Sequence, residues 1–223
     1  KLYKGAKKIN YISYQEMLEM SSLGSKVLQA KAVEYANNLN IKLYVKSTTK
    51  NSQKGTWVIN EKSIPIKEKK VVRGITHDLK QSKISILGIA DKPGVASKVF
   101  QPISKAGIIV DMIVQNISTD GKSDLTFTIP KEDLNKTVKI LQQNKVKLNY
   151  RHLLQDDRIA LISIIGAGMK TETGVASRMF KCLSRSKINI SMITTSEIKI
   201  SCVIDKNKCK SAVQALHKEF KLS

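Results

Sequence analysis

The four-residue phrase GVAS occurs twice in this chain of 223 residues, at positions 94–97 and 174–177. The likeness continues beyond the phrase, since identical residues recur at the same offset: Phe100 and Phe180, Ser104 and Ser184, Ile108 and Ile188, Met112 and Met192, and Ile113 and Ile193. Chance similarity rarely keeps identical residues in step over about twenty positions, so the chain contains an internal duplication. Two copies are too few for a solenoid, and we expect two similar small domains.

Both copies follow the same order of strand and helix patterns. In the first copy an isoleucine-rich alternation at 83–89 predicts a strand, and apolar residues at helical spacing from Val95 to Ala106 predict a helix that Gly107 ends. The other elements predicted for this copy are strands at 108–118, 123–130 and 146–153 and a helix at 131–144. This β-α-β-β-α-β order is the ferredoxin-like unit, so we expect an α+β fold with two such units in tandem.

Residues 1–60 have a different pattern. Ser13 and Glu16 form a capping box that predicts a helix start, and Gly24 interrupts that helix. A second helix is predicted with Leu28, Ala32, Ala36 and Leu39 on its apolar face. An apolar strand at 41–47 follows, with no apparent parallel neighbour within the chain, so we expect an incomplete α/β layer in this segment.

Composition limits the classes of function. The net charge is +21, but only five of the 39 basic residues are arginine, and the lysines form no single stripe, so we expect a solvated basic surface; attraction to polyanions is the alternative. An RNA-binding ferredoxin-like fold needs exposed aromatic side chains on its strands, where the copies offer only Phe127. No apolar run predicts a membrane span, and three unpaired cysteines fit a reducing cytoplasm.

Three stretches carry a resemblance to a known family. The segment YQEMLEMSSLGSKVLQAKAVEYANNLNIKLYVKST followed by GTWV resembles the end of the catalytic domain of aspartate kinases. The stretches VRGITHDLKQSKISILGIADKPGVASKVF and SIIGAGMKTETGVASRMFKCLSRSKINISMITTSEIKIS resemble the two regulatory ACT domains of that family. The resemblance implies a catalytic-domain remnant at 1–60, a connector at 61–82 with a strand that could join the second ACT domain, and ACT domains at 83–155 and 156–223.

The resemblance also implies an activity, the transfer of the ATP γ-phosphate to the side-chain carboxylate of aspartate, with Mg²⁺ accompanying the nucleotide. It assigns nucleotide contacts to Lys26 and Val27, where Gly24 permits a close approach. The family's phosphate-binding and aspartate-binding residues are absent from these 223 residues, so we expect no catalytic residue in this chain and no turnover by it alone.

The repeated glycine turn has two interpretations. Resemblance places amino-acid effector contacts in the first copy at Asp91, Gly94, Ala96 and Gln115, and in the second at Ala176, Asn189, Ile190, Ser196 and Glu197. A helix N-terminus suits the effector's carboxylate, and an acid such as Asp91 suits its ammonium. The alternative is that both glycines only make turns. The second copy has Thr171 in place of Asp91, which predicts unequal binding by the two copies.

The resemblance implies lysine, threonine or both as effectors, and a homo-oligomer formed through the ACT domains. A stand-alone tandem ACT sensor without catalysis is the alternative function. Residues 1–60 discriminate between the two, because a sensor has no reason to carry the segment SLGSKVL at 22–28.

Overall fold

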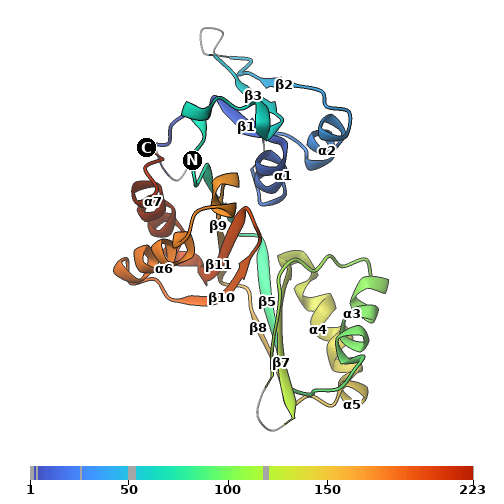
Figure 1. Cartoon of the computed structure of the whole chain (residues 1–223). Helices are drawn as coiled ribbons and strands as arrows, with labels where there is room; N and C mark the ends of the chain where they lie inside the picture. Colours follow the sequence, from blue (N-terminus) through green and yellow to red (C-terminus); the bar gives the residue numbers. More distant parts are fainter. Residues whose placement is uncertain (1–2, 4, 26, 50–53, 118–120, 223) are drawn as a thin grey trace. The chain divides into compact units, whose positions relative to one another are not determined.

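The computed structural model describes residues 3, 5–25, 27–49, 54–117 and 121–222, and it divides into two compact units. One unit combines residues 1–78 with 161–223, and the other consists of residues 79–160 (Figure 1). The second unit therefore interrupts the first along the chain.

The unit of residues 79–160 contains one four-stranded antiparallel sheet with helices beside it. Its elements are β5 (Gln81–Ala90), α3 (Val95–Lys105), β6 (Ile113–Ile117), β7 (Lys122–Pro130), α4 (Leu134–Gln143), α5 (Lys145–Leu148) and β8 (His152–Asp156). The strand order β6-β7-β5-β8 is that of the ferredoxin-like unit, with the first and third strands in the centre. The predicted fold class is confirmed for this copy.

The core of this unit follows from the alternation in its two central strands. Ile84 and Ile86 on β5 and Phe127 on β7 are fully buried, and they pack with Val99, Ile103 and Leu141 from the helices. The rings of Phe100 and Phe127 meet edge to face with their centroids 5.2 Å apart. Full burial of such side chains stabilises the fold by about 1.5–3 kcal/mol each, so these positions specify which face of the sheet is covered.

Two boundaries in this copy differ from the prediction. The strand expected at 108–118 begins only at Ile113, although Ile108 is buried. The strand expected at 146–153 is interrupted, because residues 145–148 form the short helix α5 and Asn149 takes a left-handed conformation with φ +49° before β8 begins at His152. Asparagine tolerates that conformation better than most residues, and this allows the chain to turn there.

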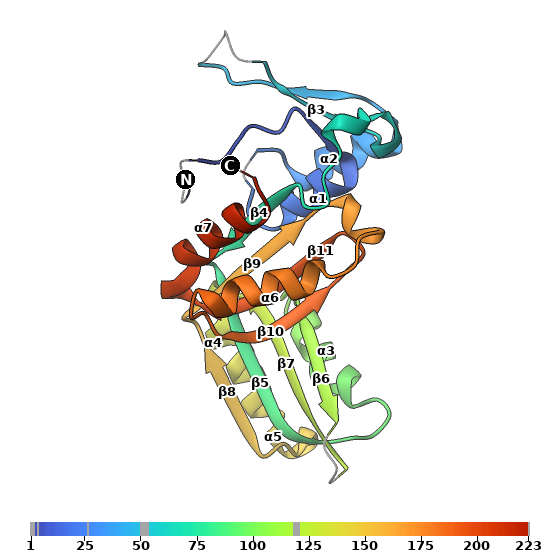
Figure 2. The same cartoon turned by 60° about the vertical axis from the view of Figure 1, so that its left-hand side comes forward.

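The sheet of the second copy receives one strand from before the first copy. Its elements are β9 (Ile159–Ile165), the 3-10 helix η4 (Ala167–Lys170), α6 (Val175–Arg185), β10 (Ile190–Thr195), β11 (Lys199–Asp205) and α7 (Cys209–Glu219). The strand order is β10-β11-β9-β4, and β4 (Gly74–Asp78) pairs antiparallel with β9, from Gly74 opposite Ile165 to Asp78 opposite Leu161 (Figure 2). The ferredoxin-like arrangement is thus completed by residues that precede it by a whole domain.

The glycine after the first strand of the second copy lies against the segment that leads into β4. A side chain at Gly166 would meet the Val71 carbonyl oxygen at 2.1 Å and the Val72 Cα at 2.8 Å. The Arg73 N–H donates to the Ile165 carbonyl oxygen at 2.7 Å, so the two backbones run together here. Only glycine permits this approach.

The amino-terminal segment adds a small three-stranded sheet with two helices. Its elements are β1 (Tyr11–Ser13), α1 (Tyr14–Ser22), α2 (Ala30–Asn38), β2 (Leu43–Val45) and β3 (Thr56–Ile59). The order is β1-β3-β2, with β1 parallel and β2 antiparallel to β3. The predicted capping box is present, since Ser13 caps α1 and the Glu16 side chain returns to the Ser13 backbone.

The predicted helix face in this segment was wrong, and the predicted strand is present but shorter and more exposed than expected. The buried face of α2 consists of Val33 and Ala36, whereas Ala32 is exposed and Leu39 caps the helix with 67% of its surface exposed. The strand predicted at 41–47 is short and half exposed, and it pairs antiparallel with β3. The helix begins only at Ala30, so Leu28 lies outside it, and the buried face includes Val33 in place of Ala32.

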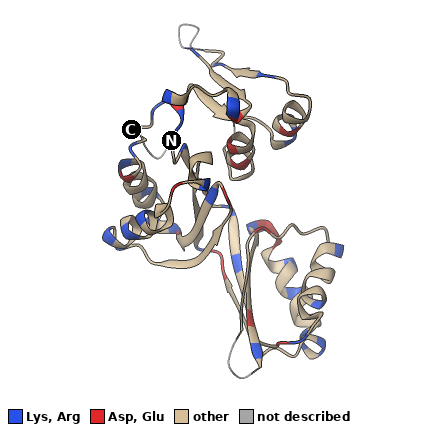
Figure 3. Ribbon diagram, viewed as in Figure 1, with Lys and Arg blue, Asp and Glu red and all other residues tan. Residues whose placement is uncertain are grey.

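Basic side chains are distributed over helices, strands and turns of both units (Figure 3). Within the described residues, no helix is long and apolar enough to span a membrane. The three cysteines, Cys182, Cys202 and Cys209, are all free and buried, and burial raises the pKa of the Cys202 thiol to about 12. Desolvation by burial also raises the pKa of the Cys182 and Cys209 thiols.

We predict that Gly166→Ala destabilises its unit by about 3 kcal/mol, because the new methyl group meets backbone atoms that cannot move independently. Gly174→Ala is the control in the same unit: it has φ +79° with open space around it, and costs only about 1 kcal/mol of backbone strain. Denaturant unfolding measures the loss of unfolding free energy in both variants, and hydrogen exchange of β9 shows whether the loss occurs at this strand. Equal losses would contradict the close approach.

We predict that none of the three thiols reacts with an aromatic disulfide reagent at pH 8 within minutes in the native protein. At a pKa of about 12, roughly one Cys202 thiol in ten thousand is ionised at that pH, and burial also blocks access. Three equivalents should react in denaturant. Rapid labelling of the native chain would show that the unit opens readily.

Candidate functional site

The first glycine turn places an acid beside a helix N-terminus. β5 ends at Ala90, Asp91 follows, and Gly94 with φ +86° precedes the first residue of α3, Val95. A β-carbon on Gly94 would meet nothing within 4 Å, so the glycine serves the left-handed conformation and leaves the approach to the helix open. Helix geometry leaves the N–H groups of the first turn, including that of Ala96, without intrahelical acceptors.

A chain of hydrogen bonds connects Asp91 with Gln115. The Gln115 Nε2 donates to Ser123 Oγ at 3.2 Å, and the Ser123 hydroxyl donates to Asp91 Oδ1 at 3.0 Å. Ser123 is fully buried, whereas Asp91 and Gln115 are exposed. The buried hydroxyl therefore orients two exposed polar groups from different elements toward one another.

This arrangement can bind a small zwitterion. The Asp91 carboxylate uses one oxygen for Ser123, and its charge suits an ammonium group. The N-terminus of α3 carries positive potential that suits a carboxylate, an interaction worth about 0.3–1 kcal/mol when exposed. The Gln115 amide supplies both donor and acceptor groups for a polar side chain.

Ser123 was missed by the sequence reasoning. A signal was present, because burial alternates along β7 at Ser123, Leu125, Phe127 and Ile129, and the serine is the one hydroxyl in that inward series. A small polar residue at an apolar position of a strand indicates a buried hydrogen bond, and its partner was Asp91.

The second glycine turn borders a pocket of about 450 Å³. The pocket is lined by residues from η4, the start of α6 and the turn between β10 and β11, among them Lys170, Glu172, Gly174, Ala176, Ser196 and Glu197. Three of the residues expected to bind an effector, Ala176, Ser196 and Glu197, thus lie together. Asn189 and Ile190 do not line this pocket, because they lie at the opposite end of β10.

The chemistry of the second turn differs from that of the first. Strand register matches Thr195 with Gln115 and Ile198 with Ser123, since Thr195 pairs with Ile200 as Gln115 pairs with Leu125. The hydroxyl relay is therefore replaced by an apolar side chain. Instead, Glu172 stands in the turn, and Lys170 Nζ lies 3.4 Å from Glu197 Oε2, so one of the two acids that line the pocket faces a cation.

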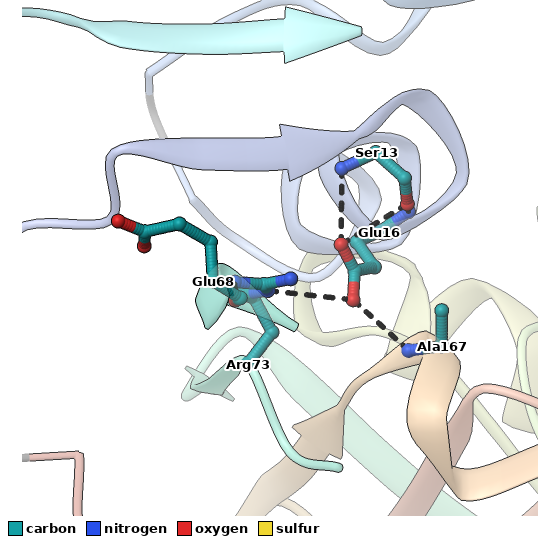
Figure 4. Close-up of polar contacts among 5 residues, drawn as sticks. All are labelled: Ser13, Glu16, Glu68, Arg73 and Ala167. Carbon is teal, nitrogen blue, oxygen red and sulfur yellow. Dashed lines mark hydrogen bonds and ion pairs between the residues drawn. The ribbon is translucent and has the colours of Figure 1, made fainter. Parts of the chain in front are cut away.

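Behind this turn lies a buried polar cluster of Ser13, Glu16, Arg73 and Ala167 (Figure 4). Glu16 is 1% exposed and Arg73 6% exposed. Glu16 Oε1 accepts from the Ala167 N–H at 2.9 Å and lies 3.7 Å from Arg73 Nε, while an Arg73 Nη1 donates to the Glu68 carbonyl oxygen. The cluster joins α1 to the first residue of η4.

The expected nucleotide contacts are only partly placed. Lys26 lies outside the described residues, and Val27 is 60% exposed in the stretch between α1 and α2. The helix expected to start near Lys26 begins at Ala30. In the described part of the chain, no group of three or more His, Cys, Asp or Glu side chains could hold a metal ion.

The aromatic side chain on which an RNA-binding interpretation depended is in the core. Phe127 is fully buried against Phe100, so it cannot stack on a base. Asp91 and Gln115 lie on the surface, where they present polar groups joined through Ser123.

Comparison with known proteins agrees with this geometry. The ACT domain family matches residues 84–144 and 162–220. Aspartokinase from Pseudomonas aeruginosa is 43% identical over 217 residues, which are 97% of this chain and 52% of that protein, so the chain spans about half the length of the relatives it matches.

Two solved structures each cover about two thirds of the chain. The aspartokinase alpha and beta subunit structure is 39% identical, with a TM-score of 0.64, over 67% of this chain and 99% of that one. The regulatory subunit of aspartate kinase from Thermus thermophilus is 33% identical, also with a TM-score of 0.64, over 68% of this chain and 99% of that one. The chain therefore belongs to the aspartokinase family and contains that family's tandem ACT domains.

Proposed function

We propose that this chain is the amino-acid-sensing regulatory part of an aspartate kinase, with the end of the catalytic domain at its amino terminus. The whole enzyme would transfer the ATP γ-phosphate to the aspartate side-chain carboxylate, with Mg²⁺ accompanying ATP and with Lys26 and Val27 as nucleotide contacts. Among the described residues, no group of three or more His, Cys, Asp or Glu side chains could hold a metal ion.

The observation that carries the sensing role is the Gln115–Ser123–Asp91 relay at the N-terminus of α3. An amino-acid effector would place its carboxylate on the first N–H groups of α3 near Gly94 and Ala96. Its ammonium would lie at Asp91 and its side chain at Gln115, which suits lysine or threonine. Because the second turn has Thr171 at the position of Asp91 and lacks the relay, we propose that the first turn binds more tightly.

The second-copy contacts divide into two groups. Ala176, Ser196 and Glu197 would contact an effector in the pocket of about 450 Å³. Asn189 and Ile190, at the far end of β10, would contact an effector bound to a second copy of the chain.

We propose a homo-oligomer through the ACT domains. The edge strand β6 supports it, because Ile113 and Ile117 are 50% and 72% exposed there, and such edges are usually paired or covered. We further propose a cytoplasmic location, which three free buried thiols suit.

We predict that Asp91→Ala weakens effector binding to the 223-residue chain about 10- to 100-fold, because a charge-assisted contact to the ammonium is worth about 1.5–3 kcal/mol. Thr171→Ala, at the matching position of the second turn, is the control and should change the affinity less than twofold. Ala176→Lys in the second turn should also matter less. Calorimetry with lysine, threonine and methionine decides: no heat with any of them, or equal losses in the two turns, would reject the proposed site.

We predict that the full-length enzyme consumes ATP only when aspartate is present, and that this chain alone shows no such turnover. In the full-length enzyme, Asp91→Ala should relieve effector inhibition while kcat stays within about twofold. A coupled assay of ADP release measures both. Turnover by the chain alone would contradict the assignment of its first 60 residues to an incomplete catalytic site.

A further inference from the structure

Glu16 is a buried carboxylate whose two oxygens serve two different segments. Oε2 accepts from the Ser13 N–H and from the Ser13 hydroxyl, each at 3.0 Å, and thereby completes the cap of α1. Oε1 accepts from the N–H of Ala167, which is 151 positions away in the chain, at 2.9 Å. Figure 4 shows the side chain between the two backbones.

The capping function alone does not require this burial. A capping-box glutamate needs one oxygen for the N-cap backbone and is normally found at the surface of a helix end. Here the side chain is 1% exposed, and the second oxygen is directed at another domain segment, with the Arg73 guanidinium 3.7 Å away. Burying a charge is unfavourable unless it is paired and hydrogen-bonded, so the position is occupied by an acid only because both segments supply donors.

Ala167 lies at the base of the turn that lines the second pocket. It is the first residue of η4, and Met169 and Lys170 of the same short helix line the pocket of about 450 Å³. On its other side, η4 borders a further pocket of about 380 Å³, whose lining includes Glu16, Arg73, Ala167 and Lys170. A displacement of this turn therefore changes the position of the N–H that Glu16 accepts.

We propose that Glu16 is a positioning residue that couples the glycine turn of the second ACT domain to helix α1 of the catalytic segment. Movement of the turn on effector binding alters the Ala167 hydrogen bond, and the same carboxylate transmits the change to the cap of α1. Helix α1 ends at Ser22, directly before Gly24 and the segment proposed to contact the nucleotide. The regulatory consequence rests on the proposed function, whereas the coupling of turn and helix does not.

The coupling is tested first on the 223-residue chain, with no ligand. Ala167→Pro removes the donor N–H at a backbone position that suits proline, the first residue of a 3-10 helix after the extended Gly166 (ψ 131°). Its ring also displaces the Glu16 carboxylate from this contact, since the N–H points at Oε1 from 2.9 Å. Ala167→Ser keeps the N–H and is the matched control.

Hydrogen exchange of residues 14–22 is the readout. We expect the proline variant to exchange about tenfold faster in α1 than the serine variant, with α2 and the ACT core unchanged. Equal exchange of α1 in the two variants would overturn the coupling. Loss of protection throughout the unit would also overturn the coupling, because the hydrogen bond would then stabilise the whole unit and not α1 in particular.

The regulatory role is tested in the full-length enzyme. Glu16→Ala should raise the effector concentration for half-inhibition about tenfold, with kcat and the KM values for ATP and aspartate within about twofold. Glu16→Gln has one acceptor oxygen, so it can serve Ser13 or Ala167 but not both, and it should restore part of the sensitivity. Glu34→Gln on the exposed face of α2 is the control and should leave inhibition unchanged.

The two hypotheses fail in different ways. If lysine, threonine and methionine leave the wild-type enzyme uninhibited, the proposed effector function is rejected, and hydrogen exchange still decides the coupling. If the wild type is inhibited and Glu16→Ala lowers kcat and effector sensitivity in parallel, Glu16 is structural and the positioning role is rejected.

Discussion

The pairing of β4 with β9 is the constraint on which the rest of this structure depends. Asp78 lies opposite Leu161, so the chain leaves one unit and returns to it at neighbouring positions, and residues 79–160 fold as an insertion with fixed ends. The same ladder holds Arg73 beside Ile165 through a backbone hydrogen bond of 2.7 Å. It thereby places Arg73 and Ala167, which flank the two strands, within reach of the Glu16 carboxylate. Strand pairing thus determines both the domain organisation and the buried polar cluster.

The two copies retain one fold and differ in the polar groups at their turns. Both have a glycine with positive φ before the helix, which preserves the turn and the helix N-terminus. The first adds an acid oriented by a buried hydroxyl, whereas the second has Ile198 at that register and a Lys170–Glu197 pair at the pocket. A carboxylate that already faces a lysine gains less from a ligand ammonium than one that does not. This difference is the basis of our proposal that the first turn binds an effector more tightly than the second.

The sequence correctly predicted the features that depend on periodicity or on contacts between residues close together in the chain. The duplication, the ferredoxin-like order of the first copy and the capping box of Ser13 all follow from periodicity or from contacts within a few residues. Contacts between segments that are distant in the chain could not be predicted in this way. The second oxygen of Glu16 depends on the distant Ala167 N–H, and the role of Ser123 depends on the side chains of Asp91 and Gln115. The predicted face of α2 was wrong because the helix begins at Ala30 and buries Val33 in place of Ala32.

The position of Glu16 requires a charged side chain for a geometric reason. Two backbone N–H groups and one hydroxyl converge on it from opposite sides, so both terminal atoms of the side chain must be acceptors. Only a carboxylate provides two acceptors at that reach, and Arg73 nearby reduces the cost of burying its charge. Each lost donor leaves the buried anion with fewer partners. The loss therefore destabilises the whole cluster and not only the contact that was broken. A turn whose position determines one of those donors therefore controls the stability of the helix cap at the other end of the same side chain.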